Sequence, residues 1–399
     1  MLSNVKGSLY RIKPHILHTP LQYSKRLSKK YNCDVFLKRE DLQKTRSFKI
    51  RGSLNKILKN YHNINSREII CASAGNHAQG VAYSCSLLNI KGKIFCPVTT
   101  PPQKIKKIKQ FGKNNIILEQ VGNSFNETLN ISKDYCNNTN GLFVHPFDDI
   151  DIINGQATIG MEIEKDIKNI DIILGSLGGG GLMSGIGIFY KDKKTKIYGV
   201  EPLGAESMTK SIQNGKIITM ENISNFVDGA SVGRVGNITF DICKKLLDDI
   251  FVIDEGRICN EMLELYQEDG IIVEPAGCLS ICGLDNLTNL KGKKVVCIIS
   301  GGNNDIMRYP EILEKNGIYL GIKHYYIVKF IQKPMELSKF IESVIHDDID
   351  IIRFEYIKKT NKSYGDVLIG FESNNIDNLE KKMKNNGFSF IKLDNYKIR

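Results

Sequence analysis

Short apolar segments rich in β-branched residues alternate with amphipathic segments between residues 69 and 316. Apolar runs of about four to eight residues predict buried strands, whereas apolar residues that recur every three or four positions predict helices. Their alternation is typical of βα units around a parallel sheet, which makes the chain an α/β protein. The predicted strands are Ile69–Ala72, Lys93–Val98, Asn115–Glu119, Ile170–Leu174, Lys196–Val200, Ile250–Ile253 and Lys294–Ile299.

The pattern changes near Gly317, where the regular alternation of strand and helix ends. The remaining chain is predicted to run strand, helix, strand, strand, helix, strand, which is the order of a ferredoxin-like βαββαβ fold. We therefore place a first domain at residues 1–318 and a second at residues 322–399. The elements of the second domain are predicted at residues 323–331, 336–345, 351–358, 366–372, 376–385 and 389–393.

Lys49 is the first residue with candidate chemistry, in the segment Ser47-Phe48-Lys49-Ile50-Arg51-Gly52 before a predicted helix. The adjacent aromatic ring would partly desolvate the amine, which lowers its pKa and makes it a nucleophile. The alternative is an ordinary surface lysine.

A second candidate is the loop Ser73-Ala74-Gly75-Asn76-His77 between a predicted strand and helix. Backbone N–H groups at a helix start bind anions, so these five residues are candidates to hold a substrate carboxylate, with Asn76 as a side-chain donor. The alternative is an ordinary helix cap formed by Ser73 or Asn76, and His77 is more typical of a structural histidine than of a catalytic one.

Glycine-rich loops follow two further strands. Gly178-Gly179-Gly180-Gly181-Leu182 can wrap closely around a phosphate at a helix start; the alternative is a flexible turn, and no Gly-Lys-Ser/Thr follows as in a Walker loop. Ser300 follows a predicted strand and precedes Gly301-Gly302-Asn303, so its hydroxyl could face a ring nitrogen of a ligand. The alternative is a turn residue or a helix cap. Together with Lys49 and Asn76, these are the parts of a pyridoxal-phosphate site.

Composition and charge argue against a nucleic-acid-binding, membrane-spanning or secreted protein. The formal charge of +11 comes from dispersed lysines without a binding motif, so no nucleic-acid partner is expected. Residues 172–190 carry no formal charge, but four glycines would break a membrane span, and the N-terminus shows no secretory signal, so we expect a cytoplasmic protein. The ten cysteines lack metal-ligand spacing and are interpreted as free buried thiols.

The whole chain resembles the threonine dehydratases (threonine ammonia-lyases), members of the tryptophan-synthase-β-like class, fold type II, of pyridoxal-phosphate enzymes. The resemblance implies that Lys49 forms the Schiff base and moves the α-proton, Asn76 binds the 3-hydroxyl, Gly178 to Leu182 hold the phosphate and Ser300 faces the pyridine nitrogen. It also implies a smaller mobile subdomain at about residues 48–150. Besides the four loops, the matching motifs are His18-Thr19-Pro20-Leu21, Leu37-Lys38-Arg39-Glu40-Asp41-Leu42-Gln43, His145-Pro146-Phe147-Asp148-Asp149, Gly199-Val200-Glu201-Pro202, Asp228-Gly229-Ala230-Ser231-Val232 and Glu274-Pro275-Ala276-Gly277.

Two departures from related serine racemases narrow the expected reaction. Ala74 replaces the serine that reprotonates the substrate in those enzymes, so racemisation is not expected. Their metal site uses a glutamate and a second acid; Glu201 is present, but Ser207 replaces the acid, so we expect no metal. The implied reaction eliminates water from L-threonine, with L-serine as a second candidate substrate, to give 2-oxobutanoate and ammonia.

The second domain resembles the ACT-like regulatory module of biosynthetic threonine dehydratases, in residues 323–328 and 350–356. A single module implies an enzyme of the first step of isoleucine biosynthesis that is regulated by a branched-chain amino acid. The family resemblance implies a homotetramer. Three alternatives remain open: a purely structural oligomerisation module, a serine-preferring or catabolic dehydratase, and an inactive amino-acid sensor.

Overall fold

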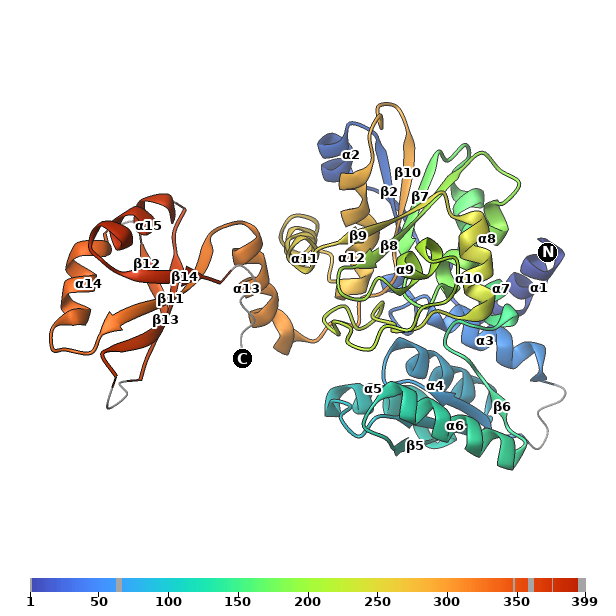
Figure 1. Cartoon of the computed structure of the whole chain (residues 1–399). Helices are drawn as coiled ribbons and strands as arrows, with labels where there is room; N and C mark the ends of the chain where they lie inside the picture. The colour runs from blue at the N-terminus through green and yellow to red at the C-terminus, as the bar shows by residue number, and fades with distance from the viewer. Residues whose placement is uncertain (1, 62–66, 347–348, 358–361, 375, 394–399) are drawn as a thin grey trace. The chain divides into compact units, whose positions relative to one another are not determined.

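A computed structural model describes residues 2–61, 67–346, 349–357, 362–374 and 376–393 (Figure 1). The chain divides into two units, Met1–Asp305 and Ile306–Arg399, each with its own buried core. The division falls before helix α13 (Tyr309–Tyr319), whereas the sequence placed the boundary after it. Helix α13 belongs with the second unit because Glu314 accepts a hydrogen bond from Lys323 at 2.7 Å.

The larger sheet of the first unit has six strands in the order β1-β2-β10-β7-β8-β9. All neighbours are parallel except β1 and β2, and β10 pairs with β2 from Lys294↔Asp34 to Ile299↔Arg39. The strands are β1 (Leu21–Tyr23), β2 (Asp34–Arg39), β7 (Ile172–Ser176), β8 (Lys196–Pro202), β9 (Asp249–Ile253) and β10 (Lys294–Ile299).

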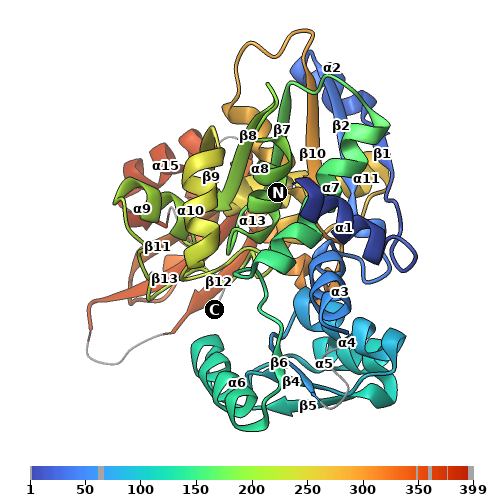
Figure 2. The same ribbon diagram turned by 90° about the vertical axis from the view of Figure 1, so that its right-hand side faces the viewer.

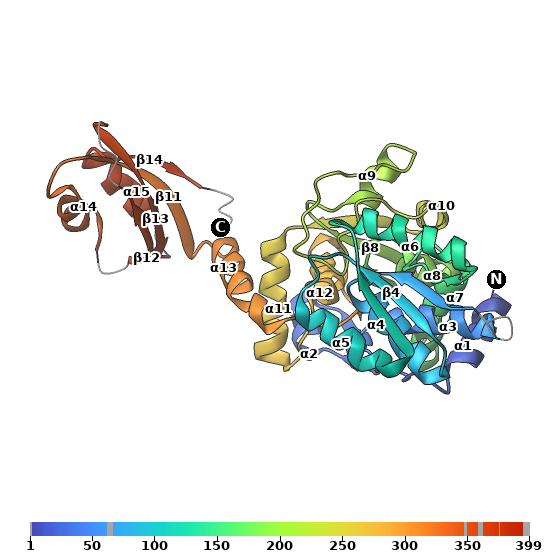
Figure 3. The same cartoon turned by 90° about the horizontal axis from the view of Figure 1, so that it is seen from below.

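A second, smaller parallel sheet has the order β5-β4-β3-β6, so the predicted strands divide between two sheets. Helices α4 and α5 cover one face and α6 the other (Figure 3). The elements are β3 (Ile69–Ala72), α4 (Asn76–Leu88), β4 (Gly92–Cys96), α5 (Pro102–Gly112), β5 (Ile116–Gln120), α6 (Phe125–Thr139) and β6 (Leu142–Phe143). Its apolar core includes Cys71, Val81 and Ile94.

Helix α3 runs between the two sheets (Figures 1 and 2). Helices α7 and α8 approach closely where Gly185 has no side chain. A Cβ at this position would lie only 2.7 Å from the backbone nitrogen of Ala157. The helices are α1 (Leu2–Ile12), α2 (Lys25–Tyr31), α3 (Lys49–Lys59), α7 (Ile150–Asp166), α8 (Gly181–Tyr190), α9 (Ser207–Gln213), α10 (Asn237–Leu246), α11 (Glu255–Asp269) and α12 (Pro275–Cys282). Short 3-10 helices occur at Glu40–Leu42, Lys113–Asn115 and Gly283–Asn286.

Residues 172–190 form β7, the glycine loop and α8, which confirms the predicted strand, loop and helix. In the described part of the chain, no helix combines the length and apolar character needed to cross a bilayer. All ten cysteines are buried and free, as predicted.

The second unit has the ferredoxin-like order predicted from the sequence. Its antiparallel sheet runs β12-β13-β11-β14, around a core that includes Phe330, Phe340 and Phe371. The predicted strand 351–358 corresponds to β12, with residue 358 outside the described residues. The elements are a 3-10 helix (Ile306–Arg308), α13, β11 (Lys323–Ile331), α14 (Glu336–Val344), β12 (Asp350–Tyr356), β13 (Tyr364–Glu372), α15 (Ile376–Asn385) and β14 (Ser389–Lys392).

Candidate active site

Lys49 is the first residue of α3, and its side chain is partly buried. Its Nζ donates a hydrogen bond to the carbonyl oxygen of Pro146 at 3.0 Å and lies 5.3 Å from the centre of the Phe48 ring. Burial lowers the pKa of the Lys49 amine to about 8, and the negative charge of Glu274 offsets a smaller part of that shift. Lys49 forms no ion pair within the described residues, so its amine can act as a nucleophile near neutral pH.

The helix that carries Lys49 is anchored by a buried ionic cluster. Arg51 is fully buried and donates to Glu40 on one side and to Glu162 of α7 on the other, each at 2.7 Å. Lys38 of β2 donates to the same Glu162 at 2.7 Å. Two cations and two carboxylates neutralise one another, which offsets the desolvation cost of burying them. This role was not predicted from the sequence, although Lys38 and Glu40 stand in one of the matching motifs.

Asn76 begins α4 beside a glycine that has no side-chain cap. The Ser73 hydroxyl accepts a hydrogen bond from the Gly75 N–H at 3.2 Å, outside the helix, so the alternative of an ordinary Ser73 cap is wrong. The amide of Asn76 instead donates to Glu274 at 2.7 Å and accepts from Asn303 at 2.8 Å. The first N–H groups of α4 therefore remain available to an anion.

The remaining two residues of this loop differ in exposure. Ala74 is partly exposed, as are its neighbours in the loop. The His77 ring is buried, and its Nε2 lies 2.8 Å from the carbonyl oxygen of Val144. Burial lowers the pKa of His77 to about 3, so the ring is neutral at physiological pH. These properties are those of a structural histidine.

The four-glycine loop joins β7 to α8 without room for side chains. A Cβ on Gly179 would lie 2.3 Å from the Phe147 ring, and one on Gly178 would lie 2.9 Å from the carbonyl oxygen of Ala230. Gly180 has a φ of +93°, which residues with side chains rarely adopt. Thr239 fixes the loop by donating to the Gly179 carbonyl at 2.7 Å. These contacts exclude side chains from the loop and favour a phosphate-binding loop over the flexible-turn alternative.

Ser300 lies at the carboxyl end of β10 and is 2% exposed. Its hydroxyl donates to the carbonyl oxygen of Ala276 at 3.0 Å, and its own carbonyl accepts from the N–H of Phe48 at 3.1 Å. The neighbouring residues Ser47 and Gly301 form a β-bridge. Ser300 is thus joined directly to the segment that carries Lys49.

Hydrogen bonds and packing contacts connect all four candidate loops. Lys49 bonds to Pro146, and the next residue, Phe147, packs against Gly179 of the glycine loop. Asn303, three residues beyond Ser300, donates to Asn76. Residues scattered over most of the first unit therefore converge on one site.

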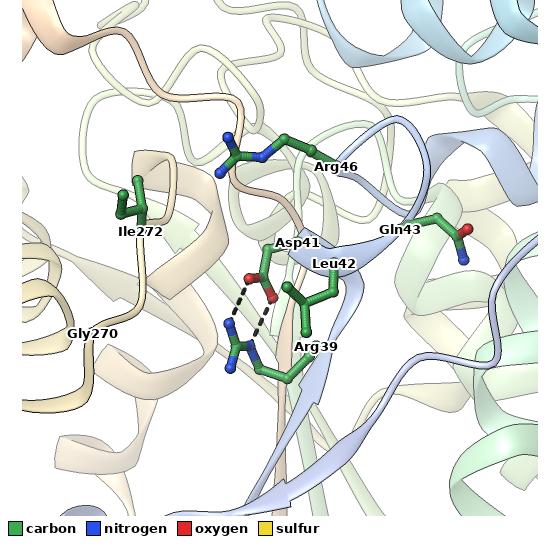
Figure 4. A pocket seen from close by; sticks show the side chains of 7 residues that line it. All are labelled: Arg39, Asp41, Leu42, Gln43, Arg46, Gly270 and Ile272. Carbon is green, nitrogen blue, oxygen red and sulfur yellow. Dashed lines mark hydrogen bonds and ion pairs between the residues drawn. The ribbon is translucent and has the colours of Figure 1, made fainter.

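A separate hollow lies beside the segment that precedes Lys49, to which Arg46 belongs. Arg39 donates two hydrogen bonds to Asp41, at 2.9 and 2.7 Å, which are drawn as dashed lines in Figure 4. The lining consists of Arg39, Asp41, Leu42, Gln43, Arg46, Gly270 and Ile272. None of the predicted site residues lines this hollow.

The donor set of the converging loops fits pyridoxal phosphate. Among the described residues, the backbone N–H groups from Gly178 to Leu182 have no hydrogen-bond acceptor, and they lie at the start of α8. Such a cluster of N–H groups at a helix N-terminus binds a phosphate. An amine with a lowered pKa, Lys49, is available for the aldehyde.

Residues 12–301 match the family of pyridoxal-phosphate dependent enzymes, and residues 314–398 match the C-terminal regulatory domain of threonine dehydratase. The chain is 47% identical over 390 residues to the biosynthetic L-threonine dehydratase IlvA of Halalkalibacterium halodurans, covering 96% of this chain and 94% of that protein. The chain belongs to the biosynthetic threonine dehydratases. Its cofactor is accordingly pyridoxal phosphate, as the sequence predicted.

Other members and solved structures agree with this assignment. The Bacillus subtilis protein of the same name is 43% identical, over 96% of this chain and 92% of its own. The structure of processed threonine deaminase isoform 2 from Solanum lycopersicum has a TM-score of 0.74 and 34% identity, covering 79% of this chain and 88% of that one. Maize serine racemase has a TM-score of 0.72 and 28% identity, covering 80% and 98%. The predicted fold type II architecture is confirmed.

The carboxylate considered for a metal site has a structural task in this dehydratase. Glu201 accepts hydrogen bonds from the backbone N–H groups of Met208 and Thr209, both at 2.8 Å, and from the Thr209 hydroxyl at 2.6 Å. It therefore caps the start of α9. Over the described ranges, no group of three or more His, Cys, Asp or Glu residues could hold a metal ion.

Proposed function

We propose that this enzyme eliminates water from L-threonine in the cytoplasm to give 2-oxobutanoate and ammonia, the first step of isoleucine biosynthesis. The observation that carries the proposal is the Lys49 amine, with its pKa lowered to about 8, linked through Pro146 and Phe147 to the glycine loop. A nucleophilic amine next to a phosphate-binding loop is the arrangement that pyridoxal-phosphate chemistry requires.

Each converging loop takes one part of the cofactor. The N–H groups from Gly178 to Leu182 would hold the phosphate, Asn76 would bind the 3-hydroxyl and Ser300 would face the pyridine nitrogen. When bound, the cofactor supplies an electron-accepting ring that makes the Cα–H of an attached amino acid acidic. A serine beside the ring nitrogen cannot keep that nitrogen protonated as a carboxylate would, which favours elimination over transamination.

The remaining chemistry belongs to residues of the chain. The loop of residues 73–77 binds the substrate carboxylate through the free N–H groups of Asn76 and His77 at the start of α4. The Lys49 amine accepts the Cα proton, and the β-hydroxyl takes up a proton and leaves as water. The released enamine tautomerises and is hydrolysed by water to 2-oxobutanoate and ammonia. Ala74 has no proton to return from the opposite face, so elimination is favoured over racemisation.

Replacing Lys49 by Ala tests this proposal. We expect Lys49→Ala to lose both turnover of threonine and the visible absorbance of the lysine-bound cofactor. Lys59→Ala, at an exposed position on the same helix, is the control and should retain both. An active Lys49→Ala enzyme would contradict the assignment, and a wild-type protein without the visible band would favour an inactive sensor.

The second unit is proposed to bind a branched-chain amino acid, in a homotetramer, and to regulate the first unit. Its match to the C-terminal regulatory domain of threonine dehydratase supports this proposal. The test is 2-oxobutanoate formation from threonine, and pyruvate formation from serine, with and without isoleucine or valine. Serine turnover that exceeds threonine turnover without any effector response would favour a catabolic dehydratase.

A further inference from the structure

Glu274 is a buried acid directly behind Asn76 that the proposed mechanism does not use. Its Oε1 accepts a hydrogen bond from Asn76 Nδ2 at 2.7 Å, and the residue is 6% exposed. The backbone N–H of Asn303 also donates to the carboxylate. A Cβ on Gly301 would lie 2.4 Å from the same Oε1, so the neighbouring backbone is shaped around the acid.

The other end of the Asn76 amide is held as well. Its Oδ1 accepts from Asn303 Nδ2 at 2.8 Å, and that nitrogen also donates to the carbonyl oxygen of Thr45 at 2.8 Å. An ionised carboxylate can only accept hydrogen bonds, so the NH₂ group of Asn76 must face Glu274. The second hydrogen on Asn76 Nδ2 has no acceptor among the described residues.

We propose that Glu274 is a positioning residue that orients the Asn76 amide so that its free N–H is presented to the 3-oxygen of the cofactor. The inference rests on the cofactor site proposed above. If the amide were reversed, its carbonyl oxygen would face the cofactor oxygen and repel it. A glutamine at position 274 can donate or accept, so it would no longer determine the orientation.

The orienting bond depends on the charge of Glu274. Burial, together with the nearby negative charge of Asp228, raises the pKa of Glu274 to about 7, and the hydrogen bond from Asn76 lowers it by a smaller amount. The orientation is therefore enforced more strongly as the pH rises through about 7. The charged groups that face Glu274 are Asp228 before α10, Lys104 and Lys107 on α5, and Lys49 on α3.

The first test uses the apo protein. In NMR spectra of the full-length protein labelled with ¹⁵N-asparagine, the side-chain amide signal of Asn76 is identified by its absence in Asn76→Ser. One hydrogen of this amide should be shifted downfield by the carboxylate of Glu274. We expect this shift to titrate with a midpoint near pH 7 and to be lost in Glu274→Gln. An Asn76 signal that is identical in the wild type and Glu274→Gln would overturn the inference.

The second test measures cofactor affinity by absorbance titration at pH 6 and pH 8. We expect Glu274→Gln to bind the cofactor about tenfold more weakly than the wild type at pH 8, or more weakly still, because a hydrogen bond that involves a charged group is lost. The wild type should bind more tightly at pH 8 than at pH 6, and this increase should shrink in the variant. Glu264→Gln removes an equal charge from α11 and should behave like the wild type.

Glu274→Asp provides a second variant if Glu274→Gln folds poorly. It keeps the acceptor-only group but shortens it by one methylene, so partial recovery of affinity relative to Glu274→Gln is expected. Affinities within twofold of the wild type in both variants would overturn the inference while leaving the proposed function intact. A wild type without cofactor binding would instead overturn the proposed function, and the NMR titration would still decide whether Glu274 orients Asn76.

Discussion

Arg51 and Glu162 form a doubly hydrogen-bonded ion pair, at 2.7 and 2.8 Å, that fastens α3 to α7 two residues after Lys49. Arg51 is fully buried and Glu162 is 3% exposed, so water cannot replace either partner. The proposed catalytic amine therefore projects from a helix whose first turn is fixed to α7, which packs in the same core as the large sheet. Such a fixed support is what a nucleophile needs in order to meet its target at a constant distance.

Replacing Arg51 by Leu should destabilise the protein strongly. The change leaves Glu40 and Glu162 buried with too few cations, and breaking a buried ion network of this kind costs about 3–5 kcal/mol. Urea unfolding of the apo protein measures the loss. Lys59→Ala removes a half-exposed lysine whose buried partner Asp151 keeps a second cation, Lys56, so the change should cost less than about 1 kcal/mol. Equal losses in the two variants would show that the cluster does not anchor α3.

Gly179→Ala should impair cofactor binding by moving the loop. The new Cβ would lie 2.3 Å from the Phe147 ring, and such overpacking costs about 1–3 kcal/mol. Gly7→Ala is the matched control, because its Cβ would meet only Arg11 at 3.5 Å and should stabilise helix α1 by about 0.5–1 kcal/mol. Absorbance titration and urea unfolding of both variants provide the comparison. Unchanged cofactor affinity in Gly179→Ala would contradict a phosphate-binding role for the loop.

The elements that the sequence predicted are those with a strong local signal. Strands β3 and β10 have the predicted bounds because β3 is apolar and buried throughout, and β10 is apolar and buried after its first residue, Lys294. The glycine loop could be predicted because four consecutive glycines, Gly178 to Gly181, are a local signal in the sequence.

Other features depend on contacts that no local pattern contains. Strand β2 was missed because Lys38 and Arg39 occupy buried positions in it, where only pairing with Glu162 and Asp41 makes charge acceptable. The pairing of Asn76 with Glu274 joins residues far apart in the chain. The division of the strands into two sheets likewise follows from tertiary packing, since both sets have the same βα pattern.

The amine of Lys49 should react with aldehydes at a lower pH than ordinary lysines. Its lowered pKa, about 8, leaves roughly half of it unprotonated at that pH, whereas a solvent-exposed lysine titrates near 10.4. Treating the apo protein with pyridoxal and borohydride from pH 6 to 10, followed by peptide mass spectrometry, measures the labelling. We expect half-maximal labelling of Lys49 near pH 8. Labelling that rises only above pH 9.5 would show that the site does not lower this pKa.

Removing the charge of Glu274 should stabilise the apo protein in a pH-dependent way. Its pKa is raised from 4.5 to about 7, so the native state prefers the protonated acid. Below pH 4.5 the group is protonated in both folded and unfolded chains and has no effect on stability. Between pH 4.5 and about 7 the unfolded chain ionises while the native state keeps the proton, so the wild type loses up to about 3 kcal/mol of stability, at 1.36 kcal/mol per pKa unit.

Glu274→Gln escapes that cost, so its stability relative to the wild type should increase between pH 5 and pH 8. Urea unfolding of both apo proteins at the two pH values measures the difference, and Glu264→Gln corrects for the general effect of removing one negative charge. The same residue would then weaken the apo fold while orienting Asn76, a compromise that proteins make where a site needs a strained or costly group. A stability difference that is equal at pH 5 and pH 8 would mean that Glu274 ionises normally, and the pH dependence expected for cofactor binding would fail with it.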